Sequence, residues 1–128
     1  MACKSGNQEI FHLLLQDKRI LFDEKVFFEC DTLKNIQIPS FITEIGDYAF
    51  SGCSSLSEVQ IPNSVTKIGD FAFNKCSSLI QISIPSSVKE IGIYILEGCT
   101  SLKTVFLPIS LNCIEKLGIS KNTLIKII

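Results

Sequence analysis

The chain has 128 residues, which fits a single domain. Apolar residues make up 46% and charged residues 20% of the sequence, so a packed interior is expected and a disordered chain is excluded. The net charge of −1 comes from 12 basic and 13 acidic side chains spread along the chain, and there is no basic stripe of the kind that nucleic-acid binding requires.

No apolar run approaches the roughly 18 residues that a membrane-spanning helix needs. The first residues also lack the basic and then apolar order of a secretory signal. These two features predict a cytoplasmic protein without a membrane span. The alternative is a cell-surface or secreted protein, if the chain was cut from a longer exported parent.

A 23-residue repeat organises most of the chain. Pro39, Pro62, Pro85 and Pro108 stand 23 residues apart, and almost every other feature recurs with them. A fixed period of this length indicates one structural unit stacked on copies of itself. Because one such unit cannot bury its apolar side alone, the copies are expected to stack into a solenoid.

The N-terminal residues 1–29 do not fit the repeat cleanly and are expected to form a cap and a degenerate first coil. Residues 7–16 are predicted to form a capping helix, with a strand as the alternative. The degenerate coil follows them, because residues 26–27 align with residues 49–50 of the next copy. This N-terminal part is expected to cover the end of the core.

Each copy of the repeat within residues 30–107 contains an apolar segment that is predicted to form a strand. The segment from Leu79 to Ile84 alternates after its first residue and is rich in β-branched side chains, a pattern typical of a strand with one buried face. A proline follows, removes a hydrogen-bond donor and ends the strand. The residues expected to point inward are Leu33, Ile36 and Ile38; Leu56, Val59 and Ile61; Leu79, Ile82 and Ile84; and Leu102, Val105 and Leu107.

A second, shorter extended stretch is expected after each proline. In the copy that begins at Pro62, Val65 and Ile68 are predicted to point inward from the opposite side of the coil. The next position is a glycine in three copies, as expected where only glycine tolerates the backbone conformation or the crowding. These glycines are Gly46, Gly69 and Gly92.

One helical turn is predicted after the glycine. Asp47 and Asp70 are interpreted as N-caps of this turn. The column of large side chains that it carries into the core is expected to contain Phe50, Phe73, Leu96 and, in the weakened last copy, Ile119.

Four cysteines share one column, because Cys30, Cys53, Cys76 and Cys99 are also 23 residues apart. Stacked coils lie about 4.8 Å apart, whereas a disulfide needs Cβ atoms roughly 3.5–4.5 Å apart with converging bonds. The column is therefore predicted to consist of buried, reduced thiols, each a weak S–H donor. Disulfides or a metal site are the alternatives, although zinc needs a tetrahedral cluster rather than a line.

Residues 108–128 form a degenerate last repeat in which Glu115 replaces the glycine and Ile114 keeps its apolar place. If one residue is deleted, Leu124 matches the first leucine of the strand and Ile127 takes the next inward place. An apolar strand at an open edge invites pairing with another chain. The C-terminal edge therefore predicts self-association, or a natural protein that continues beyond it.

The repeat I-P-x-S-V-x-x-I-G-x-x-A-F-x-x-C-S-S-L-x-x-V-x-I-P resembles the BspA-like class of leucine-rich repeats. Residues 30–107 carry the resemblance closely and residues 108–128 loosely. The resemblance implies a leucine-rich repeat solenoid with a parallel β-sheet on the concave face, and with short extended segments and helical turns on the other side. Many members of this class are surface proteins of bacteria and protists that are implicated in adhesion to host matrix proteins and to other cells.

The outward positions of the four strands form a grid of the kind that solenoids use for binding. Amides and small hydroxyls dominate it, so a protein or peptide partner suits it better than a small molecule, and no deep pocket is implied. Phe106 is the predicted energetic anchor, and the alternative is that these residues are merely solvated. The candidate partner-binding residues are Lys34, Gln37, Glu58, Gln60, Ile80, Gln81, Ser83, Lys103, Thr104 and Phe106.

The patterned residues serve turns and core and leave no convergent set of acids, bases or nucleophiles. The only histidine, His12, is far from the repeats in sequence, and Cys3 and Cys113 have no partner histidine. The chain is therefore expected to be a non-catalytic protein–protein interaction module of the adhesion or scaffold type, without a cofactor or metal. The alternative is a structural element that self-assembles through its open strand edges.

Overall fold

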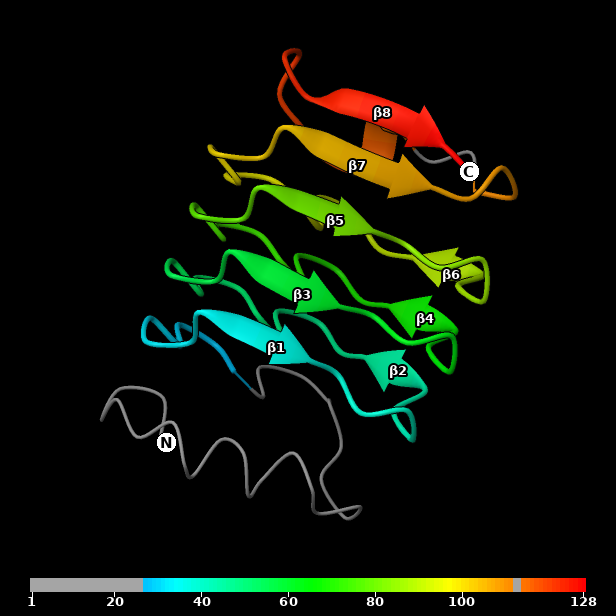
Figure 1. Cartoon of the computed structure of the whole chain (residues 1–128), viewed down its shortest axis with the longest axis horizontal. Coiled ribbons are helices and arrows are strands. Elements are labelled where there is room, and N and C mark those ends of the chain that lie inside the picture. Colours follow the sequence, from blue (N-terminus) through cyan, green and yellow to red (C-terminus); the bar gives the residue numbers. More distant parts are fainter. Residues whose placement is uncertain (1–26, 112–113) are drawn as a thin grey trace.

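The computed structural model describes residues 27–111 and 114–128 of the chain. In this part of the chain, short strands alternate with turns, and one short 3-10 helix is present (Figure 1). No helix within it is long and apolar enough to cross a membrane. The elements are β1 (Asn35–Gln37), β2 (Glu44–Ile45), β3 (Glu58–Gln60), β4 (Lys67–Ile68), β5 (Gln81–Ser83), β6 (Glu90–Ile91), β7 (Thr104–Leu107), η2 (Ile114–Lys116) and β8 (Leu124–Ile127).

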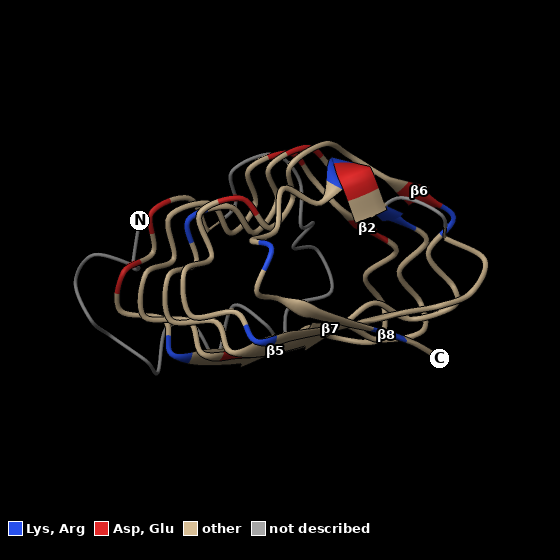
Figure 2. Cartoon of the chain, turned by 90° about the horizontal axis from the view of Figure 1, so that it is seen from above, with Lys and Arg blue, Asp and Glu red and all other residues tan. Residues whose placement is uncertain are grey.

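The strands occupy two layers on opposite sides of the stacked coils (Figure 2). We call the layer of β1, β3, β5, β7 and β8 the long-strand layer, and the layer of β2, β4 and β6 the short-strand layer. All the pairings in them are parallel. Asn35 pairs with Glu58 and Gln81 with Thr104, so the register of these pairs equals the 23-residue period. The predicted solenoid with a parallel sheet is confirmed.

The core is filled from both layers by the residues that the alternation predicted. Leu79, Ile82 and Ile84 are almost completely buried, and so are Val65 and Ile68 from the short-strand side. Among the twelve predicted inward strand positions, Val59 and Ile61 are the two that are only partly buried. Both belong to the strand segment around β3.

A stack of phenylalanine rings runs through the core along the solenoid. The rings of Phe27 and Phe50 have centroids 5.2 Å apart, and those of Phe50 and Phe73 lie 5.1 Å apart and are nearly parallel. Leu96 continues this column as a buried residue and Ile119 is partly buried, as the repeat predicted. The alignment of Phe27 with Phe50 is also confirmed, whereas the predicted capping helix or strand at residues 7–16 lies outside the described residues.

The predicted helical turns after Asp47 and Asp70 are wrong. Tyr48 and Phe71 have positive φ angles of 58° and 56°, which interrupt a right-handed helix. Every second amide of this turn bonds to the next coil, as in the 2.7 Å bond from Phe50 N to Ala72 O, and the amides between them bond three residues back, as in the 3.2 Å bond from Ala49 N to Gly46 O. The stacking of coils therefore takes half of the donors that a helix would have used.

The aspartates link neighbouring coils rather than capping helices. Oδ1 of Asp47 accepts a hydrogen bond from Asp70 N at 2.8 Å, and Oδ1 of Asp70 accepts one from Ile93 N at 3.0 Å. The glycine before the aspartate is required by crowding. A Cβ atom on Gly69 would lie 2.6 Å from Asp47 N and 2.8 Å from the carbonyl carbon of Gly46, which is closer than side chains approach backbone.

The cysteine column consists of buried thiols, as predicted. Sγ of Cys53, Cys76 and Cys99 donates to the carbonyl oxygens of Phe27, Phe50 and Phe73, at 3.2, 3.2 and 3.1 Å respectively. Each thiol thus reaches back to the coil before it. The neighbouring Cys99 thiol, together with burial, raises the pKa of the Cys76 thiol above its usual range, and the same interaction lowers the pKa of Cys99.

The last coil departs from the predicted register. Thr104 pairs with Leu124 and Val105 with Ile125, a separation of 20 residues instead of 23. Because this coil is shorter than a single deletion would make it, Leu124 and Ile127 are each 53% exposed, and Ile125 is the residue that packs against the core. The predicted inward places of Leu124 and Ile127 are therefore wrong. Ile114, in η2, is also exposed.

Candidate functional site

The outward positions of the long-strand layer form the grid that the repeat predicted. The parallel register aligns them in columns, with Gln37 beside Gln60 and Ser83 beside Phe106. Eight of the ten candidate residues are exposed, and Thr104 and Phe106 are half-buried. Whether these residues bind a partner remains a prediction.

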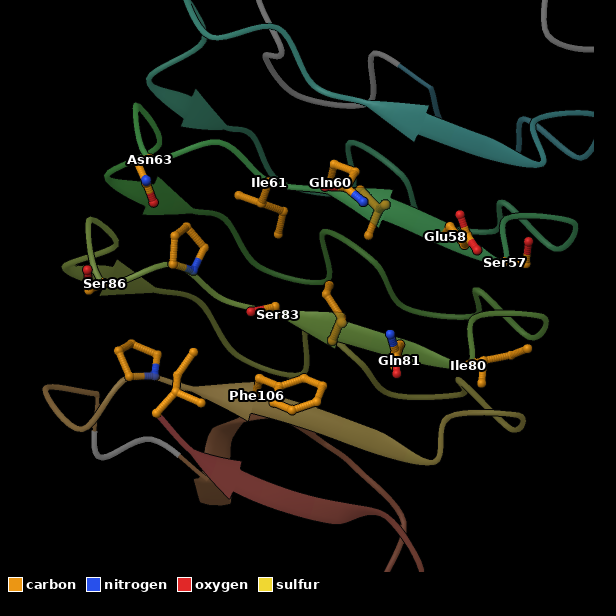
Figure 3. Close-up of a pocket in the computed structure, with 15 residues that line it drawn as sticks. Ser57, Glu58, Gln60, Ile61, Asn63, Ile80, Gln81, Ser83, Ser86 and Phe106 are labelled. Carbon is orange, nitrogen blue, oxygen red and sulfur yellow. The ribbon is translucent and has the colours of Figure 1, made fainter.

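A groove crosses this face over β3, β5 and β7, with a cavity volume of about 740 Å³ (Figure 3). It brings together six of the candidate residues, and the other four, Lys34, Gln37, Lys103 and Thr104, lie outside its lining. The groove thus includes only part of the predicted grid. The candidate residues in its lining are Glu58, Gln60, Ile80, Gln81, Ser83 and Phe106.

The groove also includes residues that the sequence did not indicate as part of a site. Val59, Ile61 and Ile82 line it, although the alternation predicted that all three point into the core. Asn63 and Ser86, which follow the prolines, line the end of the groove away from Glu58 (Figure 3). No pocket was expected from the repeat, because a regular strand layer presents a flat face.

The hydrogen-bond ladder of the long-strand layer is interrupted at the groove. β1 pairs with β3, and β5 pairs with β7 and β8, but β3 and β5 belong to separate sheets. Elsewhere two backbone bonds recur between neighbouring coils. The first joins Ser57 N to Lys34 O and is repeated as Lys103 N to Ile80 O. The second joins Ile38 N to Gln60 O and is repeated as Ile84 N to Phe106 O. Neither has an equivalent between the segments around β3 and β5, both of which lie within the described part of the chain.

The same two coils remain joined on their other sides. β4 pairs with β6, Phe71 N bonds to Ile93 O at 3.0 Å, and Phe73 N bonds to Ile95 O at 3.0 Å. The opening is therefore confined to the long-strand layer. It explains why Val59 and Ile61 are less buried than their equivalents in the other copies.

Phe106 is held in place at the groove rather than fully exposed. It lies opposite Lys126 in the β7–β8 pair, and Nζ of Lys126 is 5.7 Å from the ring centroid. A cation at this distance from an aromatic ring is attracted to it. Phe106 is half-buried and presents an apolar surface at the edge of the groove.

The groove carries little charge and no catalytic constellation. Glu58 is the one charged side chain among its lining residues. Residues 27–111 and 114–128 contain no cluster of histidine, cysteine and carboxylate side chains that could hold a metal ion. His12, Cys3 and Cys113 lie outside the described residues, so their predicted roles are not addressed by the structure.

The model of the BspA type leucine rich repeat region matches residues 20–128, with six copies of the repeat. The chain belongs to this family. Its match begins ten residues before the segment in which the repeat is plain by inspection. A comparison with curated proteins gives no match.

Solved structures of bacterial leucine-rich repeat proteins resemble the BspA-type chain. A leucine-rich repeat protein from Bacteroides ovatus is 33% identical, with a TM-score of 0.78 over 85% of this chain and 28% of its own. A leucine rich cell surface protein from Faecalibacterium prausnitzii is 35% identical, with a TM-score of 0.65 over 71% of this chain and 23% of its own. The chain thus spans about a quarter of the length of these two proteins.

Proposed function

We propose that this BspA-type chain is a non-catalytic protein-interaction module of the adhesion or scaffold type, and that its long-strand face binds the partner. The groove over β3, β5 and β7 supports the proposal most directly, because it gathers five other candidate residues around the aromatic ring of Phe106. Aromatic side chains commonly anchor protein interfaces.

The relatives favour the adhesion form of this function. The protein from Faecalibacterium prausnitzii is described as a cell surface protein, and leucine-rich repeats as a class present extended faces to other proteins. A surface location of this chain is part of the proposal. An intracellular scaffold is the other form, and the two differ in where the partner is found.

Affinity capture with a matched pair of variants tests the proposal. The chain is immobilised and offered extracellular matrix proteins and, separately, a lysate of its own organism. Phe106→Ala is expected to weaken binding of the captured partner about fivefold or more, since the ring supplies roughly 1 kcal/mol or more at an interface. Unchanged affinity would remove the long-strand face from consideration.

Phe41→Ser is the control for the loss of an aromatic ring. Phe41 is exposed, lies outside the groove lining, and stands where the next two copies have Ser64 and Ser87. Those serines bond to the carbonyls of Ile42 and Val65 at 2.6 Å, so serine suits this position. Phe41→Ser is expected to bind the partner as the wild type does.

The exposed edge of β8 favours self-assembly as a second candidate function. β8 is the last strand of its sheet and pairs with β7 alone, and Leu124, Ile127 and Ile128 are each more than half exposed along it. Sedimentation over a range of concentrations is expected to show oligomers that Ile127→Lys shifts to monomer. A wild-type chain that stays monomeric at high concentration would exclude this candidate.

A further inference from the structure

The interrupted ladder between β3 and β5 leaves backbone groups without the partners they have elsewhere. Ile38 and Ile84 donate their amide hydrogens to the neighbouring coil, at 3.1 and 2.9 Å. Ile61 occupies the same position in its copy, and its amide makes no such bond within the described structure. By the same equivalence, the carbonyl of Ser57 lacks the amide that bonds to the carbonyls of Lys34 and Ile80.

The residues that carry these groups, Ser57 and Ile61, line a groove with an apolar floor. Val59, Ile61 and Ile82 form the floor beside the open ladder, and Phe106 lines one side. Backbone donors and acceptors at a free strand edge are satisfied best by the backbone of another extended segment. The apolar floor in turn accepts a side chain that stands out from such a segment.

The charge of the groove adds a further restriction. Glu58 is its only charged lining side chain, and it is exposed at one end of the groove, whereas the amides and hydroxyls of Asn63 and Ser86 lie at the other end (Figure 3). A cationic group near Glu58 is attracted to it, and an anionic group is repelled. Along an extended chain, the step from Glu58 to Ile61 is about three residues, or roughly 10 Å.

We propose that the open ladder between β3 and β5 is a docking site for an extended peptide segment of a protein partner. The segment places an aliphatic side chain on the floor of Val59 and Ile61, and it places a lysine or arginine about three residues away, beside Glu58. Its backbone bonds to the free Ile61 amide and Ser57 carbonyl of the segment around β3. This inference rests on the proposed function and names the part of the partner that the long-strand face recognises.

Amide hydrogen exchange measured by NMR tests the open ladder directly. In the free protein, the Ile61 amide is expected to exchange roughly 100-fold faster or more than those of Ile38 and Ile84, because it lacks their hydrogen bonds. If the Ile61 amide is as protected as its two equivalents, the ladder is closed in solution and the inference is overturned.

Selection from a random decapeptide library tests which peptide sequences the site binds. Peptides selected on the purified chain are expected to share an aliphatic residue and a basic residue about three positions apart, and to slow the exchange of the Ile61 amide. Glu58→Lys is expected to weaken their binding about tenfold. Glu44→Lys, an exposed charge reversal on β2 in the short-strand layer, is expected to leave binding unchanged.

The outcomes separate the inference from the proposed function. A library that yields no binder, or binders that ignore Glu58→Lys and leave the Ile61 amide unprotected, overturns the peptide site. If Phe106→Ala still weakens the binding of a captured protein in that case, the long-strand face binds its partner by another mode. If Phe106→Ala has no effect either, both proposals fail.

Discussion

Single residues in this chain serve the contact between coils more than the shape of any one coil. Asp47 and Asp70 each bond to a backbone group of a neighbouring coil, and so do the thiols of Cys53, Cys76 and Cys99. The residue types were predicted correctly as structural, but the role of the aspartates was not. The sequence Asp-X-Ala-Phe after a glycine is compatible both with a helix N-cap and with a link between coils. Only the position of the neighbouring coil determines which amide donates a hydrogen bond to the carboxylate.

The paired thiols of Cys76 and Cys99 make stability depend on pH in the alkaline range. Their interaction raises the pKa of Cys76 and lowers that of Cys99, and burial acts to raise both. In the unfolded chain both thiols have a pKa of about 8.5. Above that pH the unfolded chain releases both protons while the folded pair keeps the one on Cys76, so stability falls as the pH rises through this range.

Urea unfolding under reducing conditions at pH 9 and pH 10.5 measures this loss. The wild type is expected to lose about 2 kcal/mol more stability than a variant with both Cys76→Ala and Cys99→Ala, which is the linkage for one proton that only the folded pair keeps over this pH range. The double variant is less stable at both pH values because of its cavities, so the comparison is made on the pH dependence. An equal loss of stability in the two proteins would contradict the assignment.

At the scale of elements, the alternation of the strands was predictable and the last strand was not. Three copies of one pattern define the inward positions for each other, so Leu79, Ile82 and Ile84 could be placed from sequence, and all three are buried. The last copy has lost residues in its turn, and no second copy shows where. Pairing with β7 settles the register, because β8 must present one apolar residue to the core beside Val105.

The corrected register predicts unequal effects of two neighbouring isoleucines. Ile125 is partly buried against the core, and Ile127 is 53% exposed. Ile125→Asn is expected to lower the free energy of unfolding by about 1–3 kcal/mol, and Ile127→Asn by less than about 0.5 kcal/mol. Chemical denaturation of both variants measures this, and a larger loss for Ile127→Asn would restore the register inferred from sequence.

At the scale of the whole molecule, the 23-residue period was sufficient to predict a stacked solenoid and its family. The period could not predict the groove, because a repeat describes what the copies have in common. The open ladder is a difference between copies: the segments around β3 and β5 keep the consensus residues at Val59, Ile61 and Ile82, yet they lack the bonds that their equivalents make. Six of the residues that line the groove were candidates from the pattern, and the apolar floor beneath them was not predicted.

The confinement of that opening to one layer has a mechanical consequence. The coils that contain β3 and β5 stay joined through β4 and β6 and through the turn amides of Phe71 and Phe73. Within the described residues, the contact between these two coils therefore has fewer backbone bonds on its long-strand side than the contacts on either side of it. We expect the stack to bend there more readily than at its other coil contacts, with the short-strand side as the hinge.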